Sequence, residues 1–384
     1  MRFEFATANR IVFGPGSIAE AGKVIATFGN RALVLTGASG ARSSVLLEKL
    51  AAANITATLL PVTGEPTVEG VKQGAERAVG DQCDVIVGFG GGSAIDSAKA
   101  IAALAANGGE PLDYLEVIGK GKPLTKTSLP CVAIPTTAGT GAEVTRNAVL
   151  MSLEHKVKVS LRSASMLPRA AIVDPELTLS LPLAVTASTG MDALAQLIEP
   201  FVSIKANPIT DSFCREGMRR AARSLQRTYE HGDDRTARED MACASLFGGL
   251  ALANSGLGAV HGFAGPIGGL FPIPHGAVCA CLLPIVMEVN LHALRERQPD
   301  SHILQKYDEI AQILTANPNA TSQDGVNWVQ ELCSALRIQP LRAFGIDDKS
   351  VPELIEKSAV ASSMQANPLK LTYDELREIL MRAL

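Results

Sequence analysis

The chain has 384 residues, which is more than one hydrophobic core usually accommodates and predicts two or three domains. Hydrophobic residues make up 47% and charged residues 19%, so a large core is available and a disordered chain is excluded. The net charge of -4 and the lack of a basic stripe exclude a protein that holds nucleic acid through phosphate contacts.

Cysteine usage and apolar stretches indicate the compartment. Seven cysteines are scattered without a CxxC pair, which predicts a reducing compartment and no disulfide framework. Two of them, Cys279 and Cys281, alternate in an apolar run that is typical of a core. The first residues lack the apolar segment of a signal peptide, and no apolar stretch reaches the roughly 20 residues of a membrane span. We therefore expect a cytoplasmic protein.

Short β-rich runs alternate with helical patterns in the first half of the chain. The expected strands are 10–14, 31–37, 55–62, 84–93, 130–137 and 169–175, and the expected helices are 43–54, 67–79 and 94–107. Two alternating runs within 142–163 predict a hairpin. Repeated strand–helix units predict an α/β domain with a doubly wound, mostly parallel sheet that is covered on both faces.

Beyond residue 181, β-rich runs become rare and Ala/Leu-rich helical segments take over. The expected helices are 182–204, 208–229, 235–256, 259–270, 276–296, 302–315, 321–336, 350–361 and 373–383. This change of pattern predicts an α/β domain over 1–181 and an all-helical domain over 182–384.

A glycine-rich loop leaves one expected strand and opens the next helix. In GFGGGSAIDSAK (88–99), Gly91 and Gly92 let backbone N–H groups approach a pyrophosphate, and Ser93 stands at the expected helix N-cap. A helix N-terminus favours negative charge, so these three residues are candidate cofactor contacts. The loop lacks the GxGxxG spacing of the dinucleotide fingerprint, and a tight strand–helix turn without a ligand is an equal alternative.

A second loop, PTTAGTGAEVT (135–145), also follows an expected strand. Thr136, Thr137 and Thr140 offer hydroxyl and backbone donors to phosphate or ribose, although a plain polar turn has the same composition.

A third loop, TGASGARS (36–43), bears on the choice of cofactor. Gly37 ends the strand, and Ser39 and Arg42 follow. No carboxylate stands here to repel a 2′-phosphate, while a hydroxyl and a guanidinium are available to hold one. The loop therefore favours NADP over NAD, unless Arg42 is only a solvated residue at the start of a helix.

Candidate metal ligands lie in the second half of the chain. Asp192 and Gln196 are four residues apart on one face of an expected helix, and His261 and His275 share a glycine-rich segment. A carboxylate, an amide oxygen and two imidazoles are donor types that bind divalent metals. The histidine spacing is not that of a compact zinc site, so buried hydrogen-bonding groups are an equal alternative on spacing alone.

Four motifs are more specific together than any one of them alone. They are GGGSAIDSAK (90–99), PTTAGTGAEVT (135–145), TGMDAL (189–194) and HGFAGPIGGLFPIPHG (261–276). With them the chain resembles the iron-containing (group III) alcohol dehydrogenases over essentially its full length. The resemblance implies a dinucleotide-binding domain, a helical metal and substrate domain, and an active site between them. It also implies hydride transfer between a nicotinamide cofactor and a small alcohol or aldehyde at a divalent metal.

The resemblance implies that Asp192, His261 and His275 are catalytic metal ligands. The family's second ligand, four residues after the aspartate, is a histidine, and here it is Gln196. A histidine often found four residues after the third ligand is replaced by Gly265. An amide oxygen is a neutral and usually weaker ligand than imidazole, so we expect weaker binding, and zinc or another divalent ion as an alternative to iron.

Two further cofactor contacts rest on the resemblance, with Glu65 expected near the adenine end and Lys158 at the ribose. Asp96 and Lys99, on the helix after the glycine loop, are expected to anchor phosphates or the loop. A plain intrahelical pair of Asp96 and Lys99 is the alternative. The cofactor is NADP or NAD, with NADP favoured.

The expected partners are a small alcohol or aldehyde and further copies of the chain, since family members are commonly dimers or larger. Neither nucleic acid nor a membrane is expected. The alternative function is that of a metal-independent reductase of the maleylacetate type, which acts on an oxo-acid. Dehydroquinate synthase shares the architecture, but the basic cluster needed for a phosphorylated substrate is missing.

Overall fold

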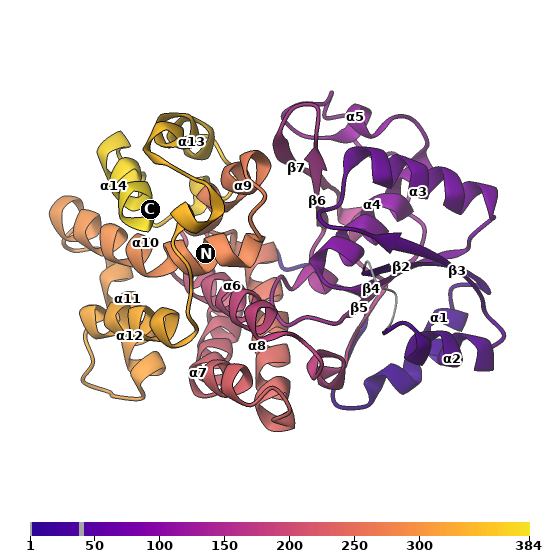
Figure 1. The fold of residues 1–384 in the computed structure, drawn as a ribbon, viewed down its shortest axis with the longest axis horizontal. Coiled ribbons are helices and arrows are strands. Elements are labelled where there is room, and N and C mark those ends of the chain that lie inside the picture. The colour runs from indigo at the N-terminus through magenta and orange to yellow at the C-terminus, as the bar shows by residue number, and fades with distance from the viewer. Residues whose placement is uncertain (1, 38–41) are drawn as a thin grey trace. The chain divides into compact units, whose positions relative to one another are not determined.

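A six-stranded parallel sheet forms the framework of the first half of the chain (Figure 1). The structure, a computed structural model, describes residues 2–37 and 42–384. Within these residues the strand order is β1-β8-β5-β4-β2-β3, and every neighbouring pair is parallel. The strands are β1 (Ile11–Phe13), β2 (Arg31–Gly37), β3 (Thr56–Val62), β4 (Val85–Gly90), β5 (Cys131–Pro135) and β8 (Ala170–Val173). The predicted α/β fold class is confirmed.

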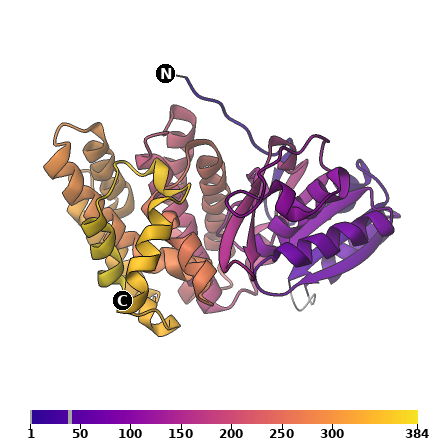
Figure 2. The same cartoon turned by 90° about the horizontal axis from the view of Figure 1, so that it is seen from above.

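Helices cover both faces of this sheet. They are α1 (Ala21–Ala26), α2 (Ser44–Ala52), α3 (Val68–Gly80), α4 (Gly92–Asn107) and α5 (Pro111–Tyr114). Leu33 and Leu35 of β2 join a core with α3 and α4, whereas Ala32 and Val34 join a core with α1 and α2. Helices α3 and α4 pack against each other on one face (Figure 1, Figure 2). Because side chains alternate along a strand, both faces of the sheet are buried.

An antiparallel hairpin follows β5, as the two alternating runs predict. It pairs β6 (Asn147–Ser152) with β7 (Val157–Arg162), and β6 packs on α4. Leu150 and Leu161 of the hairpin join the core of α3 and α4. The hairpin is therefore fixed to the sheet through the helix that begins at the glycine loop.

The second half of the chain is helical, as predicted. Its helices in the described part of the chain are α6 (Leu183–Val202), α7 (Pro208–Glu230), α8 (Arg235–Ser255), α9 (Ala259–Leu270), α10 (His275–Arg297), α11 (His302–Thr315), α12 (Ser322–Ala335), α13 (Val351–Ala359) and α14 (Tyr373–Ala383). Their apolar side chains share one large core. Among the described helices, α10 alone is long and apolar enough as a single helix to span a membrane, but 72% of its apolar window is buried. It is a core helix of this half of the chain.

The chain divides into two compact units, which we name the α/β unit and the helical unit. The α/β unit comprises Ala6–Thr137 and Gly141–Leu179. The helical unit comprises Ala138–Thr140 and Ser180–Leu384, with the residues before Ala6. A short piece of the loop after β5 therefore belongs to the helices.

Two local features differ from the sequence interpretation. Helix α4 begins at Gly92 with Gly91 as its N-cap, so the predicted N-cap role of Ser93 is wrong. The reason is that Gly91 has the extended backbone of an N-cap residue, while Ser93 already lies in the first helical turn. Helices α1 and α5 were not expected, because six and four residues are too short to show a helical period.

Candidate active site

Three loops of the α/β unit follow the carboxyl ends of neighbouring strands of the sheet. Strands β5, β4 and β2 are adjacent, and Gly90 at the end of β4 is in register with Pro135 at the end of β5. The strand order reverses between β2 and β4, since β2 is followed by β3 on one side and β4 by β5 on the other. Open α/β sheets bind ligands at such a switch point. Gly37 ends β2 here, whereas Ser39 lies outside the described residues.

The loop after β4 leads directly into α4. No described side chain caps the first N–H groups of this helix, and its first turn carries no acidic residue. Gly91, Gly92 and Ser93 therefore form a helix N-terminus that suits an anionic group such as a phosphate.

The first part of the loop after β5 lies against that helix start. The Thr136 N–H donates a hydrogen bond of 2.9 Å to the carbonyl oxygen of Gly90. A Cβ on Gly91 would lie 3.4 Å from the Cγ2 and Oγ1 atoms of Thr137. Gly91, Thr136 and Thr137 are thus brought together, as the sequence interpretation requires.

Thr140, unlike Thr136 and Thr137, belongs to the helical unit. Its segment Ala138–Thr140 packs tightly, because a Cβ on Gly139 would lie only 2.7 Å from the Cβ of Thr189. Thr189 stands on α6, three residues before Asp192.

Asp96 is engaged inside the α/β unit. Its Oδ1 lies 2.8 Å from Nζ of Lys99, and its Oδ2 accepts a 2.9 Å hydrogen bond from the Val149 N–H. Lys99 is fully buried and also donates to the carbonyl oxygen of Ala142 and to Oγ1 of Thr145. This network favours the alternative of an intrahelical pair, which ties α4 to the hairpin.

Lys158 and Glu65 form an ion pair, with Nζ of Lys158 at 2.9 Å from Oε1 of Glu65. The lysine side chain is only 4% exposed, whereas the glutamate is 44% exposed. Two residues that the resemblance assigns to the cofactor are therefore in direct contact.

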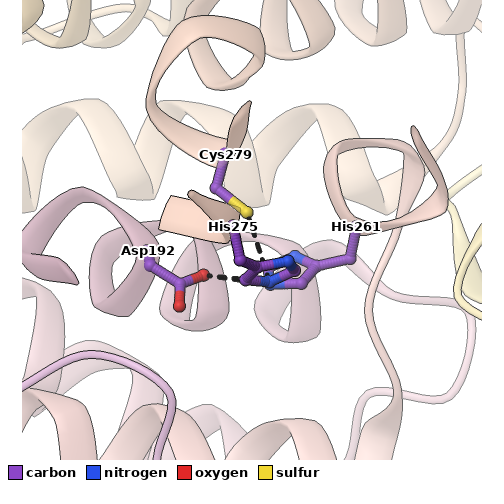
Figure 3. Close-up of side chains that lie close together, drawn as sticks. All are labelled: Asp192, His261, His275 and Cys279. Atoms are coloured by element: carbon purple, nitrogen blue, oxygen red, sulfur yellow. Dashed lines mark hydrogen bonds and ion pairs between the residues drawn. The ribbon is translucent and has the colours of Figure 1, made fainter. Parts of the chain in front are cut away.

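Four side chains of the helical unit converge on one point (Figure 3). They are Asp192 of α6, His261 of α9, and His275 and Cys279 of α10, and one ligand atom from each lies within 4.8 Å of the others. Asp192 Oδ1 is 3.2 Å from Nε2 of His261 and 3.7 Å from Nε2 of His275. The structure thus brings three of the predicted metal ligands together.

Close backbone packing of α10 on α6 places part of this cluster. A Cβ on Gly276 would lie 2.4 Å from the carbonyl oxygen of Ser188, so any other residue would push the two helices apart. His275 is the first residue of α10, and Cys279 follows one helical turn later on the same face.

Glu199 orients His261 from the side away from Asp192. Its Oε2 lies 2.6 Å from Nδ1 of His261, and its Oε1 accepts a 2.7 Å hydrogen bond from the Val260 N–H. A carboxylate can only accept, so Nδ1 carries a proton, and Nε2 is the ring nitrogen that faces the cluster. A carboxylate that holds a histidine in this way is the usual support of a metal-binding imidazole.

Charges within the cluster outweigh the effect of burial on two of its groups. Burial acts to raise the pKa of Asp192, but His275 and His261 hold it below its ordinary value. Burial acts to lower the pKa of His261, but Cys279, Glu199 and Asp192 raise it well above its ordinary value. Burial raises the pKa of the Cys279 thiol to about 12. The carboxylates make this a site that attracts positive charge.

Gln196 stands one helical turn after Asp192 on α6. Its side chain is buried, and its Oε1 makes no hydrogen bond to any described residue. A buried acceptor without a partner costs roughly 1–3 kcal/mol, and a divalent cation is a partner that removes this cost. The residues present therefore fit a divalent metal.

Two functional candidates escaped the sequence interpretation. Cys279 was assigned to the core, which accounts for its burial but not for its histidine neighbours. Its position four residues after His275 is the same helical signal that linked Asp192 to Gln196. Glu199 gave no comparable signal, because its role depends on the packing of α9 against α6.

The fold, and the sequences of both halves of the chain, have counterparts in known proteins. A model of the iron-containing alcohol dehydrogenases matches residues 8–175, and a model of the C-terminal part of the Fe-containing alcohol dehydrogenase family matches residues 186–384. Alcohol dehydrogenase 4 of Schizosaccharomyces pombe is 35% identical over 379 residues, which cover 97% of this chain and 87% of that protein. The NAD-dependent methanol dehydrogenase of Bacillus methanolicus is 34% identical over 381 residues, 97% of each chain. A crystal structure of 1,3-propanediol oxidoreductase aligns over the whole of both chains with a TM-score of 0.92 at 33% identity.

Proposed function

Because the chain belongs to the iron-containing alcohol dehydrogenase family, we propose that it interconverts a small alcohol and its aldehyde by hydride transfer with NAD(P) at a divalent metal. One observation carries the metal part of this proposal. Asp192 Oδ1 and the Nε2 atoms of His261 and His275 converge, and Gln196, whose buried amide oxygen lacks a described partner, follows Asp192 by one turn of α6.

The four proposed ligands supply different donors. Asp192 contributes the anionic oxygen, His261 and His275 contribute neutral nitrogens, and Gln196 contributes a neutral oxygen. Bound metal and nicotinamide supply Lewis-acid polarisation of the substrate oxygen and the hydride, respectively. Glu199 keeps the Nε2 lone pair of His261 directed at the site. Three helices hold these groups, which favours a fixed geometry.

The proposed cofactor site lies at the carboxyl ends of the strands. The start of α4 would receive the pyrophosphate, because its N–H groups lack a described side-chain cap. The remaining contacts would frame the ribose and adenine, and Asp96 would act indirectly, because its bonds to Lys99 and to the Val149 N–H fix α4 to the hairpin. The proposed cofactor residues are Gly37, Ser39, Glu65, Gly91, Gly92, Ser93, Asp96, Thr136, Thr137, Thr140 and Lys158.

The cofactor is proposed to be NADP or NAD, with NADP favoured. The segment from Gly37 to Arg42 carries no acid, and the Arg42 side chain is exposed beyond β2. NAD stays the alternative, because the name of the methanol dehydrogenase relative specifies NAD. Comparing kcat/KM for NADPH and NADH decides between them.

The substrate is proposed to be a small alcohol or aldehyde, the class that the names of two relatives print as methanol and 1,3-propanediol. Gly265 stands one turn after His261 on α9, and a Cβ there would meet no described atom within 4 Å. This open space favours a substrate with more bulk near His261 than a histidine at position 265 would allow.

Gln196 also leaves a competing function, that of a reductase of the maleylacetate type. Such an enzyme needs no metal, so it would tolerate an amide in place of a metal-binding imidazole. Chelator treatment separates the two functions: loss of activity that added Zn²⁺ or Fe²⁺ restores supports the metal-dependent function. Full activity towards an oxo-acid after chelation supports the competing one.

The experiment that tests the proposed function is oxidation of NADPH and NADH by the purified protein with a panel of short aldehydes. We expect turnover of at least one aldehyde with added divalent metal. No turnover of any aldehyde with either nucleotide and with Zn²⁺, Fe²⁺, Co²⁺ or Ni²⁺ would refute it.

We also propose that the enzyme is cytoplasmic and works as a homodimer or larger oligomer. Strand β1 lies at the edge of the sheet, where a second copy can pair with it. Light scattering on the purified protein measures the number of subunits.

A further inference from the structure

We propose that the thiolate of Cys279 takes the place of the Gln196 oxygen as the fourth protein ligand of the same divalent metal, and that the set Asp192, His261, His275 and Cys279 selects zinc over iron. This inference rests on the metal site of the proposed function and names a ligand that the resemblance does not supply. It is carried by the positions of the four donor atoms (Figure 3).

Four of the six distances between these atoms lie close to the edges of a tetrahedron around zinc. Zinc–nitrogen bonds of about 2.0–2.1 Å and a zinc–sulfur bond of about 2.3 Å imply edges of about 3.6 Å from sulfur to nitrogen and about 3.3 Å between lighter atoms. Cys279 Sγ lies 3.6 Å from Nε2 of His275 and 3.8 Å from Nε2 of His261. Asp192 Oδ1 lies 3.2 and 3.7 Å from the same two nitrogens.

Hydrogen bonding accounts for this arrangement only in part. A thiol has one proton and is a weak donor, yet Sγ of Cys279 faces two imidazole nitrogens. Both are Nε2 atoms, and for His261 the opposite nitrogen is held by Glu199. Four donor atoms that surround one point are what a metal requires.

The chemistry of the set also differs from that of one aspartate and three neutral donors. When the metal–sulfur bond forms, the thiol releases its proton to solvent, and the dication then has two anionic ligands. Thiolate is a soft ligand that suits zinc, and zinc stands above Fe²⁺ in the general order of affinity. The thiol thus compensates for the imidazole that Gln196 does not provide.

X-ray absorption at the zinc edge of the wild-type protein, loaded with one Zn²⁺ per chain, tests the coordination directly. We expect one sulfur at about 2.3 Å together with nitrogen and oxygen ligands at about 2.0–2.1 Å. A shell of nitrogen and oxygen alone, or failure of the chain to bind Zn²⁺, would overturn the proposal. This measurement needs no variant and no turnover.

Cobalt substitution identifies which cysteine is bound. Wild-type protein loaded with Co²⁺ alone should show a sulfur-to-cobalt charge-transfer band in the near ultraviolet. Cys279→Ser should lose this band, and the matched control Cys281→Ser should keep it. Cys281 lies on the same helix but donates to the carbonyl oxygen of Ala383. A band that survives in Cys279→Ser, or is lost only in Cys281→Ser, would contradict the assignment.

Competition between Zn²⁺ and Fe²⁺ under anaerobic conditions tests the selectivity. We expect the ratio of bound zinc to bound iron to fall about tenfold in Cys279→Ser, because a hydroxyl is a harder ligand than a thiolate. An unchanged ratio would refute the selectivity. A protein that binds zinc through sulfur but reduces no aldehyde would support this inference and refute the proposed function. A protein that reduces an aldehyde but binds its metal without sulfur would support the proposed function and refute this inference.

Discussion

The two candidate regions are built in opposite ways. In the α/β unit each cofactor loop directly follows a strand, so its residues are neighbours in the sequence. In the helical unit the cluster gathers side chains from three helices, and Asp192 and His261 are 69 positions apart in the sequence. A loop therefore contacts its ligand through its own backbone, whereas the cluster depends on how the helices pack. Changes in the loops should therefore alter cofactor binding alone, and changes in the cluster should act through the metal.

Asp192→Asn should give the largest effect. It keeps the side-chain shape but removes the carboxylate at the centre of the cluster. We expect loss of bound metal and a fall in kcat/KM of at least about 100-fold, since Lewis-acid stabilisation supplies several kcal/mol. Elemental analysis and steady-state kinetics measure both. His292→Ala, at an exposed histidine of α10, is the control. An Asp192→Asn enzyme that keeps its metal and its activity would contradict the role of the cluster as the metal site.

Much of the fold was predictable, and the reason is local periodicity. Each expected strand and long helix has a counterpart, because alternation and helical spacing can be read over five to twenty residues. The start of α4 was misassigned, since Ser93 is a better N-cap residue than Gly91 by composition alone.

The cluster was predictable only in part. Asp192, His261 and His275 stood out through the family motifs, while Gln196 was recognised by its spacing from Asp192. Cys279 and Glu199 were not recognised, because a cysteine in an apolar run and an acid in a helix are common core and capping residues. Only the approach of α10 and α9 to α6 brings them beside the histidines.

Glu199→Gln should weaken metal binding by about 10–100-fold, the usual cost of losing the group that supports a metal-binding histidine. An amide in place of the carboxylate no longer fixes the proton of His261 on Nδ1 as firmly. Competition with a chelating dye measures the affinity, and Glu296→Gln, at an exposed acid of α10, is the control. Equal affinities of the variant and the wild type would remove Glu199 from the account.

Gly91→Ala should act on the cofactor alone. Its new methyl group would meet Thr137 at an ordinary 3.4 Å, so the fold is kept, but the group occupies the approach to the start of α4. We expect KM for the nucleotide to rise about tenfold, equivalent to about 1.4 kcal/mol, with unchanged metal content. Gly80→Ala, at the end of α3, serves as the control because no described atom lies near its Cβ. A loss of metal instead would show that the two regions are not separable.

Arg42→Ala should give the smallest effect. An exposed guanidinium that meets a 2′-phosphate contributes about 1 kcal/mol, so KM for NADPH should rise about fivefold while KM for NADH stays constant. Parallel titrations with the two nucleotides measure the difference. An equal change for both would remove the argument for NADP from this loop.

Anomalous X-ray scattering from crystals of the metal-loaded protein both locates and identifies the ion, and so it tests the metal site without any variant. We expect one strong peak within bonding distance of Asp192, His261 and His275, with data across the zinc and iron edges assigning the element. No peak at this position in crystals that hold one metal ion per chain elsewhere would contradict the proposed metal site.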